Sequence, residues 1–91
     1  MSCGDKALAF AVAFGTALPV LVELAGEIAT KKIKAKTAAK ALVVLPGLIQ
    51  AGRELFECLT SSGKTAEADA IQQKVDALQQ EYDLLSQYAA A

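Results

Sequence analysis

Few side chains in this sequence could do chemistry, and their spacing points away from catalysis. Histidine is absent, which removes the usual proton shuttle and the commonest metal ligand. The two cysteines, Cys3 and Cys58, match no Cys-x-x-Cys spacing, and a metal site would need two further ligands that no histidine can supply. We therefore expect no metal, no cofactor and no small-molecule substrate, and we interpret the chain as a protein without enzymatic activity.

The two cysteines are interpreted as unpaired thiols. Cys58 lies in an apolar run and is expected to pack as a small hydrophobic side chain, while Cys3 falls at a terminus that is expected to fray. A disulfide between them would require the fold to bring these distant positions together. We therefore expect reduced thiols in reducing surroundings.

The segment Ser61–Thr65, SSGKT, resembles the end of a phosphate-binding loop. In the pattern G-x-x-x-x-G-K-T, Gly63, Lys64 and Thr65 match the last three positions, but the first glycine would fall on Cys58. No predicted strand precedes the segment. We interpret it as a turn between helices, in which Gly63 takes the left-handed position after the first helix and Thr65 caps the next.

The elements that position these residues are predicted to be helices. The 91 residues are 54% hydrophobic and only 5% aromatic, which favours close-packed helices over sheets. Their net charge of −1 provides no overall field to attract nucleic acid. We predict a single all-α domain over 1–91 with three helices, in which a C-terminal antiparallel hairpin accompanies a strongly apolar N-terminal helix.

The first helix is predicted over 7–29 and is apolar on every side. Such a helix must be covered all round, by protein or by lipid. Pro19 is expected to bend it near Gly15 and Thr16. Small residues recur every four positions, which permits close approach of a second helix. The residues expected to mediate self-association are Ala9, Ala13, Ala17, Ala11, Gly15, Phe10 and Phe14.

A basic connector is predicted over 30–40. Its lysines form a basic patch of Lys31, Lys32, Lys34, Lys36 and Lys40. We interpret the patch as a solvated face or a salt-bridged contact with the acidic third helix, with anionic lipid heads and nucleic-acid phosphates as less favoured partners. Glu23 and Glu27 are expected to mark the end of the apolar helix or to pair with Lys31 and Lys32.

Two further helices are predicted over 37–61 and 66–88. The first is amphipathic and kinked at Pro46, where the Pro46-Gly47 pair could instead split it in two. The second repeats its apolar residues at alternating spacings of three and four, which is typical of a coiled-coil seam. This seam consists of Ala68, Ile71, Val75, Leu78, Tyr82, Leu85 and Ala89.

The first helix is also a borderline membrane span. Its charge-free run, Ala7–Val22, is shorter than the roughly 20 residues that a span needs, unless Glu23 is admitted at one end. The lysines after it would then form a collar that places the C-terminus in the cytoplasm. A second span is disfavoured, because the uncharged part of the next helix, Ala41–Gly52, is too short.

Three segments give the chain a pattern that resembles small bacteriophage-encoded helical proteins. They are the apolar run Ala17–Leu24 (ALPVLVEL), the segment Leu48–Phe56 (LIQAGRELF) and the Gln- and acid-rich helix Ala66–Leu85. The likeness covers most of the chain and rests on common residue types. It implies a virion component or a protein associated with lysis or the envelope, and it transfers no functional residues.

The expected function follows from the uncovered first helix. Two short helices cannot enclose residues 7–29, so other copies or other subunits must supply the missing cover. We therefore expect a non-catalytic structural protein of a virion or cytoplasmic assembly, which self-associates or docks through this helix. The alternative is a single-span membrane protein with a lysine collar and a cytoplasmic helical hairpin.

Overall fold

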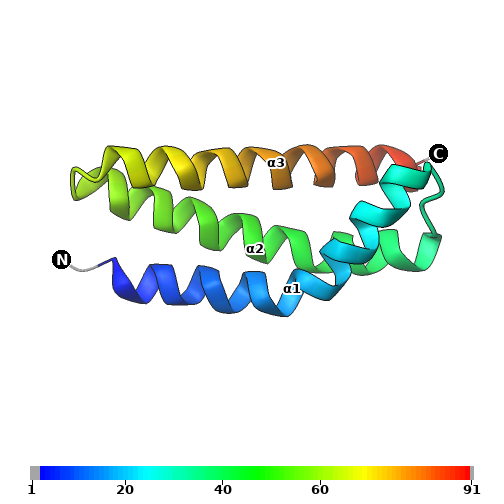
Figure 1. The fold of residues 1–91 in the computed structure, drawn as a ribbon, viewed down its shortest axis with the longest axis horizontal. Coiled ribbons are helices and arrows are strands. Elements are labelled where there is room, and N and C mark those ends of the chain that lie inside the picture. The colour runs from blue at the N-terminus through cyan, green and yellow to red at the C-terminus, as the bar shows by residue number, and fades with distance from the viewer. Residues whose placement is uncertain (1–2, 91) are drawn as a thin grey trace.

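The computed structural model is a bundle of three helices (Figure 1). It describes residues 3–90, with side chains through Tyr88. Helix α1 spans Gly4–Thr30, α2 spans Ala35–Ser61 and α3 spans Thr65–Ala90, and residues 3–90 contain no strand. The all-α class and the long apolar N-terminal helix are confirmed. Each helix begins one to three residues earlier than predicted, because the caps lie outside the apolar pattern that defined the predicted bounds.

Helix α2 is the central element of the bundle. It packs against both α1 and α3, whereas α1 and α3 make no direct backbone contact within residues 3–90. The short turn after α2 reverses the chain, so α2 and α3 form the predicted antiparallel hairpin (Figure 1). The molecule is elongated, with extents of 43 × 20 × 19 Å. Side chains on α2 therefore form the middle of the core.

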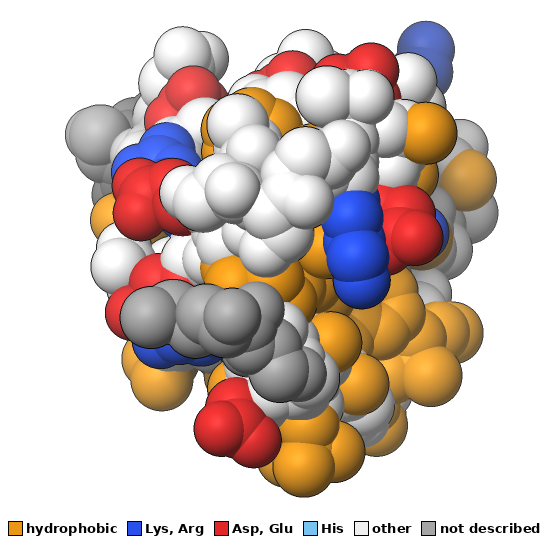
Figure 2. Space-filling model, turned by 90° about the vertical axis from the view of Figure 1, so that its left-hand side faces the viewer, with side chains coloured by type: hydrophobic (Ala, Val, Ile, Leu, Met, Phe, Trp, Pro, Cys, Tyr) orange, Lys and Arg blue, Asp and Glu red, His pale blue; other side chains and the backbone are white. Residues whose placement is uncertain are grey.

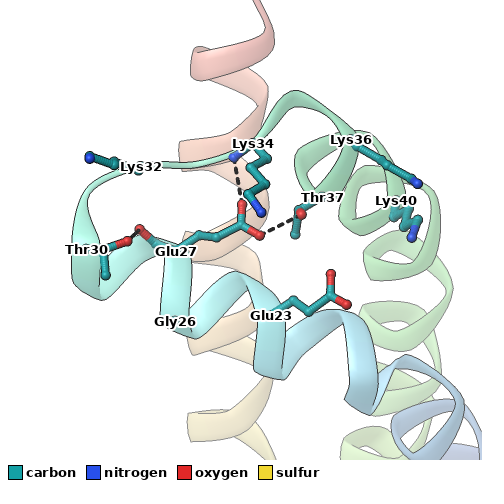
Figure 3. A pocket seen from close by; sticks show the side chains of 9 residues that line it. All are labelled: Glu23, Gly26, Glu27, Thr30, Lys32, Lys34, Lys36, Thr37 and Lys40. Atoms are coloured by element: carbon teal, nitrogen blue, oxygen red, sulfur yellow. Dashed lines mark hydrogen bonds between the residues drawn. The ribbon is translucent and has the colours of Figure 1, made fainter.

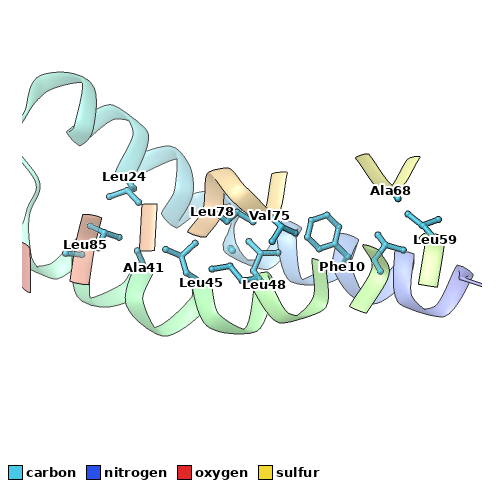
Figure 4. Close-up of a cluster of buried hydrophobic side chains, with 14 of the residues drawn as sticks. Phe10, Leu24, Ala41, Leu45, Leu48, Leu59, Ala68, Val75, Leu78 and Leu85 are labelled. Carbon is cyan, nitrogen blue, oxygen red and sulfur yellow. The ribbon is translucent and has the colours of Figure 1, made fainter. Parts of the chain in front are cut away.

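The core is a row of hydrophobic side chains along this axis (Figure 4). From α2 it receives Ala38, Ala41, Leu45, Leu48, Ile49, Leu55 and Leu59. From α3 it receives Ala68, Val75, Leu78 and Leu85, all members of the predicted seam. Helix α1 contributes only three buried residues, each seven positions from the next: Phe10, Ala17 and Leu24. The heptad spacing gives α1 a narrow buried stripe.

The closest approach in the bundle is at Gly52 on α2. A Cβ at this position would lie 2.6 Å from Val75 Cγ2 and 3.1 Å from Phe10 Cε1. Side chains from α1 and α3 therefore meet over the bare backbone of α2. The sequence suggested Gly15 for this kind of contact, but a Cβ there would meet nothing within 4 Å.

Helices α1 and α2 each contain an internal proline. In α1 the direction of the helix changes part-way along its length (Figure 1), as expected from Pro19, which has no N–H to donate to the carbonyl of Gly15. Thr16 Oγ1 donates to the carbonyl oxygen of Val12 at 2.9 Å in the turn before the bend. Helix α2 continues through Pro46 as one helix, so the alternative of two separate helices is wrong.

The turn between α2 and α3 follows the pattern predicted for Gly63. This glycine has φ 78°, and the next backbone N–H, on Lys64, donates to the carbonyl of Leu59 at 2.9 Å. Thr65 does not occupy the capping position, because the N–H of Ala68 donates to the carbonyl of Lys64 at 2.9 Å. Lys64 therefore precedes α3 and Thr65 is its first helical residue.

The turn after α1 uses a lysine where a glycine is usual. Lys31 has φ 59°, a left-handed conformation that strains any residue with a Cβ. We expect Lys31→Gly to raise the free energy of unfolding by about 1 kcal/mol, measured by urea denaturation. Lys32→Gly, which removes the same charge outside the left-handed position, is the control and should not stabilise. Equal effects of the two substitutions would contradict this explanation.

Candidate interaction surface

The side of α1 that faces away from the bundle is apolar and exposed. Four large aliphatic side chains on this side keep 45–64% of their surface accessible. They are Leu8, Val12, Leu18 and Val22, and we call them, with Gly15, the outer face of α1. In the end-on view of Figure 2, hydrophobic side chains gather at the level of α1, whereas polar and charged ones prevail at the level of α3. A soluble chain rarely leaves such a row uncovered.

The residues predicted to mediate self-association divide between two sides of α1. Phe10 and Ala17 are buried in the core of the same chain, and Ala13 and Phe14 pack partly against that core. Phe10 and Phe14 also lie against each other, with ring centroids 6.1 Å apart. These four residues therefore cover α2 and α3 instead of forming an outer surface. The remaining three, Ala9, Ala11 and Gly15, are exposed.

The two cysteines form a disulfide, so the expectation of separate reduced thiols is wrong. Cys3 and Cys58 are joined by their sulfur atoms, with their Cα atoms 5.8 Å apart. Helix α1 runs antiparallel to α2, which places the start of α1 beside the last turn of α2 (Figure 1). Cys3 is buried, and its Sγ lies 3.5 Å from Ser62 Oγ. The bond fastens the N-terminal end of α1 to the hairpin.

Glu27 connects the C-terminal end of α1 to the start of α2. One carboxylate oxygen accepts the backbone N–H of Lys34 and the other accepts the hydroxyl of Thr37, both at 2.6 Å (Figure 3). The carboxylate thus caps the first turn of α2, where a negative charge is stabilised by the helix dipole. The expected pairing of Glu27 with Lys31 or Lys32 is wrong, because the start of α2 offers it two hydrogen bonds instead.

The basic patch surrounds a hollow between α1 and α2. This hollow has a volume of about 560 Å³ and is lined by lysines and by both glutamates (Figure 3). Four members of the patch line it: Lys32, Lys34, Lys36 and Lys40. Within the described residues, the one ion pair joins Lys6 and Glu54 at 3.8 Å, so the expected salt bridges from the patch to the third helix do not form. The lysines of the patch are exposed to solvent.

The capping role of Glu27 predicts a dependence of stability on pH. Its hydrogen bonds with Thr37 and Lys34 lower its pKa below the ordinary value of 4.5. Because the pKa is lower in the folded state, the carboxylate stabilises the fold above about pH 4.5 and loses this effect as the pH falls through the folded-state pKa. We expect Glu27→Gln to lower the Tm at pH 7, and the difference from the unmodified protein to disappear in strong acid.

Thermal denaturation followed by circular dichroism between pH 2 and 8 measures this effect. The control is Glu23→Gln, since Glu23 lies one turn away and makes no hydrogen bond or ion pair with the described residues. Burial raises the pKa of Glu81 on α3, so this residue disfavours the folded state as the pH rises. The effect is the same in all three proteins and cancels in the difference between their Tm values. A Tm difference that is the same at every pH would contradict the capping role.

Helix α3 has one buried and one polar side. Val75, Leu78 and Leu85 are buried, Ile71 and Tyr82 are partly buried, and the side chain of Ala89 lies outside the described residues. On the polar side, Gln72 donates to Asp76 at 2.7 Å and Gln79 donates to Asp83 at 3.0 Å. Arg53 of α2 donates to Gln79 at 3.0 Å. Helix α3 therefore exposes a row of glutamine and aspartate side chains on the side away from the core.

Comparisons with other proteins assign neither a family nor a function to the chain. No protein-family model, curated protein or solved structure matches the chain.

Helix α1 is long and apolar enough to cross a membrane, with a mean hydropathy of 2.0 in its most apolar window. The described residues hold no cluster of three or more side chains suited to a metal ion.

Proposed function

We propose that this chain is a non-catalytic assembly protein that self-associates through the outer face of α1. The observation that carries the proposal is the row of exposed aliphatic side chains opposite the buried stripe of α1. Covering these side chains removes apolar surface from water, which is the main favourable term in protein association. The polar side chains of α3 would remain in solvent.

The disulfide favours this proposal over the single-span alternative. If α1 alone crossed a membrane, its 27 residues would separate its two ends by about 40 Å. Cys3 would then lie on the opposite side of the bilayer from the hairpin that carries Cys58. The bond between these residues requires both on the same side. With the bond intact, α1 stays on the bundle and presents its outer face to a partner.

The same bond favours an oxidising location. Disulfides persist on virions and cell surfaces and in secretory compartments, and are rare in the cytosol. An assembly in an oxidising environment, such as a virus particle outside its host cell, fits both the bond and the resemblance to small bacteriophage-encoded proteins. This proposal replaces the cytoplasmic location with one in which Cys3 and Cys58 stay oxidised.

The single-span membrane protein remains the second candidate, because α1 satisfies the length and hydropathy of a span. In this form the disulfide is open, α1 leaves the hairpin and the lysines of residues 31–40 form a collar at the membrane surface. The other two helices cannot follow into lipid, because their outward sides carry Arg53, Glu54 and Glu57 on α2 and acidic residues on α3.

Fractionation of the full chain without reducing agent separates the two candidates. The assembly protein is expected in the soluble fraction, where sedimentation velocity at micromolar concentration should give a species larger than 9.5 kDa. Mass spectrometry after thiol alkylation should show no modified cysteine. A chain that pellets with membranes, resists carbonate extraction and has two alkylated cysteines would support the membrane candidate. A compact monomer in buffer would contradict the proposed self-association.

A further inference from the structure

The bond between Cys3 and Cys58 lies between two hollows at the surface of the molecule. The larger hollow, of about 620 Å³, is lined by Cys58 but not by Cys3, together with Lys6, Glu54 and Glu57. The smaller hollow, of about 340 Å³, is lined by Cys3 but not by Cys58. Cys58 is partly exposed, whereas Cys3 keeps only 8% of its surface accessible. A thiol in solution therefore has better access to Cys58 than to Cys3.

We infer that this disulfide is a redox switch, which a dithiol opens by attack on Cys58 and which then releases residues 4–15 from the hairpin. We call these residues the first part of α1. The inference is independent of the proposed self-association, because it needs no second chain. The switch operates when the chain passes from oxidising to reducing surroundings.

The reduction consists of two thiol–disulfide exchanges. A thiolate of the dithiol attacks Sγ of Cys58 on the side opposite Cys3 and forms a new sulfur–sulfur bond, and the electron pair of the broken bond leaves on Sγ of Cys3. The second thiol of the dithiol then displaces Cys58 from this mixed disulfide. The dithiol ends as a disulfide, and its two protons pass through solvent to the two cysteines of the chain.

The two cysteines lie at opposite kinds of helix end, and this difference determines which sulfur leaves. Cys3 is the N-cap residue of α1, where the partial positive charge of the helix end stabilises a thiolate. Cys58 lies in the last turn of α2, where the partial charge is negative. Glu54 and Glu57 beside Cys58 add to this negative charge, and Lys6 opposes them. Cys3 is therefore the better leaving group, and Cys58 is the sulfur that is attacked.

Ser62 assists the departure of Cys3. Its hydroxyl lies 3.5 Å from Sγ of Cys3 and is the donor, because a disulfide sulfur carries no hydrogen. A hydrogen bond to the sulfur becomes stronger as negative charge develops on it. Lys64 and Glu67 line the hollow beside Cys3 with opposite charges, and solvent screens the exposed carboxylate of Asp5 in the first turn. The hydroxyl and the helix end are thus the groups that stabilise the thiolate.

Few contacts other than the disulfide hold the first part of α1 on the hairpin. Phe10 is its one buried side chain, and Ala13 and Phe14 pack partly against the core. An ion pair between Lys6 and Glu54, with an N–O distance of 3.8 Å, joins it to α2, but both side chains are about half exposed. Such exposed pairs contribute little to stability. Opening the disulfide therefore removes the strongest of these attachments.

The bend at Pro19 separates the first part of α1 from residues 16–30. Pro19 has no N–H to donate to the carbonyl of Gly15, and the helix changes direction part-way along its length (Figure 1). Beyond the bend, Leu24 is buried and the carboxylate of Glu27 caps the start of α2. The first part of α1 can therefore move about the bend while the remainder of the helix stays on α2.

Trapping the mixed disulfide tests which sulfur is attacked. The oxidised chain is treated briefly with excess β-mercaptoethanol, a monothiol, then quenched in acid, and its peptic peptides are analysed by mass spectrometry. We expect the mercaptoethanol adduct on Cys58 and a free thiol on Cys3. An adduct on Cys3, an equal division between the two cysteines, or a bond that stays closed in the folded chain would overturn the inference.

The rate of reduction by dithiothreitol tests the role of Ser62. We expect Ser62→Ala to slow the reduction roughly threefold to tenfold, the rate equivalent of one neutral hydrogen bond, and Ser62→Thr to keep the rate of the unmodified protein. The control is Ser61→Ala, since Ser61 lines the hollow beside Cys58 and makes no hydrogen bond to Cys3 within the described residues. Equal rates for Ser62→Ala and Ser61→Ala would overturn the assignment of Cys3 as the leaving sulfur.

Hydrogen exchange of the oxidised and the dithiothreitol-reduced chain tests the release of the first part of α1. After reduction, we expect the amides of residues 5–15 to lose protection, while those of residues 20–30 and of α3 keep it. Reoxidation in a glutathione disulfide buffer should restore the protection. Loss of protection along the whole of α1, no loss at all, or a loss that reoxidation does not reverse would overturn the inference.

Discussion

The double substitution Cys3→Ser and Cys58→Ser is expected to lower the free energy of unfolding by about 4 kcal/mol. The bond closes a loop between residues 55 positions apart, and loop-closure entropy in the unfolded chain predicts a loss of this size. For a chain of this length, the corresponding fall in Tm is roughly 15–30 °C. Helix α1 should be affected most, because it has only three buried residues to hold it on α2.

Thermal denaturation followed by circular dichroism measures this loss. The control is the unmodified protein treated with a reducing thiol, which should melt at the same temperature as the double variant. Hydrogen exchange adds a local measurement, in which the amides of α1 should lose more protection than those of α3. A difference in Tm of only a few degrees, or uniform loss of protection, would contradict the role of the bond in fastening α1.

Gly52→Ala is expected to destabilise the bundle by about 1–3 kcal/mol, because the new methyl group overlaps neighbours from two helices. A Cβ at this position would lie 2.6 Å from Val75 Cγ2 and 3.1 Å from Phe10 Cε1. Because Phe10 and Val75 are buried on other helices, neither can move aside without opening the core. Urea denaturation measures the loss, and Gly52→Leu should unfold the protein under milder conditions still.

The matched control is Gly47→Ala in the same helix. A Cβ at Gly47 would meet nothing within 4 Å, so this substitution should gain the better helix propensity of alanine without any overlap. We expect Gly47→Ala to raise the free energy of unfolding by about 0.5–1 kcal/mol. If both glycine variants shifted stability in the same direction, close packing would not be the reason for a glycine at position 52.

Features with a local cause could be predicted from the sequence. Helices α2 and α3 follow from apolar periodicity, α1 follows from a hydrophobic composition with few aromatic residues, and the left-handed turn follows from Gly63. The buried side of α3 follows from the spacing of Val75, Leu78 and Leu85. Each of these depends on residues within a few turns of one another, and the periodicity of a helix reports such relations directly.

Features that depend on the packing of distant segments could not be predicted. The pairing of Cys3 with Cys58 requires the antiparallel course of α1 on α2, which apolar residues on every side of α1 do not specify. For the same reason, the sequence does not show which residues of α1 are buried in the core and which belong to its outer face. Gly52 gave no signal of its own, because the overlap depends on Phe10 and Val75 from two other helices.

The spacing of Glu27 from the next helix is compatible with a capping role, although the sequence analysis favours ion pairs. A carboxylate seven residues before Lys34, the residue that precedes the next helix, is close enough to reach the backbone N–H of Lys34, provided that the connector folds back. The lysines nearby suggested ion pairs instead. Capping prevails because the hydroxyl of Thr37 and the N–H of Lys34 are held in place by the helix, whereas lysine side chains are mobile and well solvated.

The bond between Cys3 and Cys58 also determines how the molecule responds to mechanical tension. When force is applied to the two termini, the load passes from Cys3 across the sulfur atoms to Cys58 and then along the end of α2 into α3. Helix α1 and the connector of residues 31–34 lie outside this path. Force on the termini would therefore separate α3 from the rest of the bundle, and the disulfide-closed loop of residues 3–58 would not be extended.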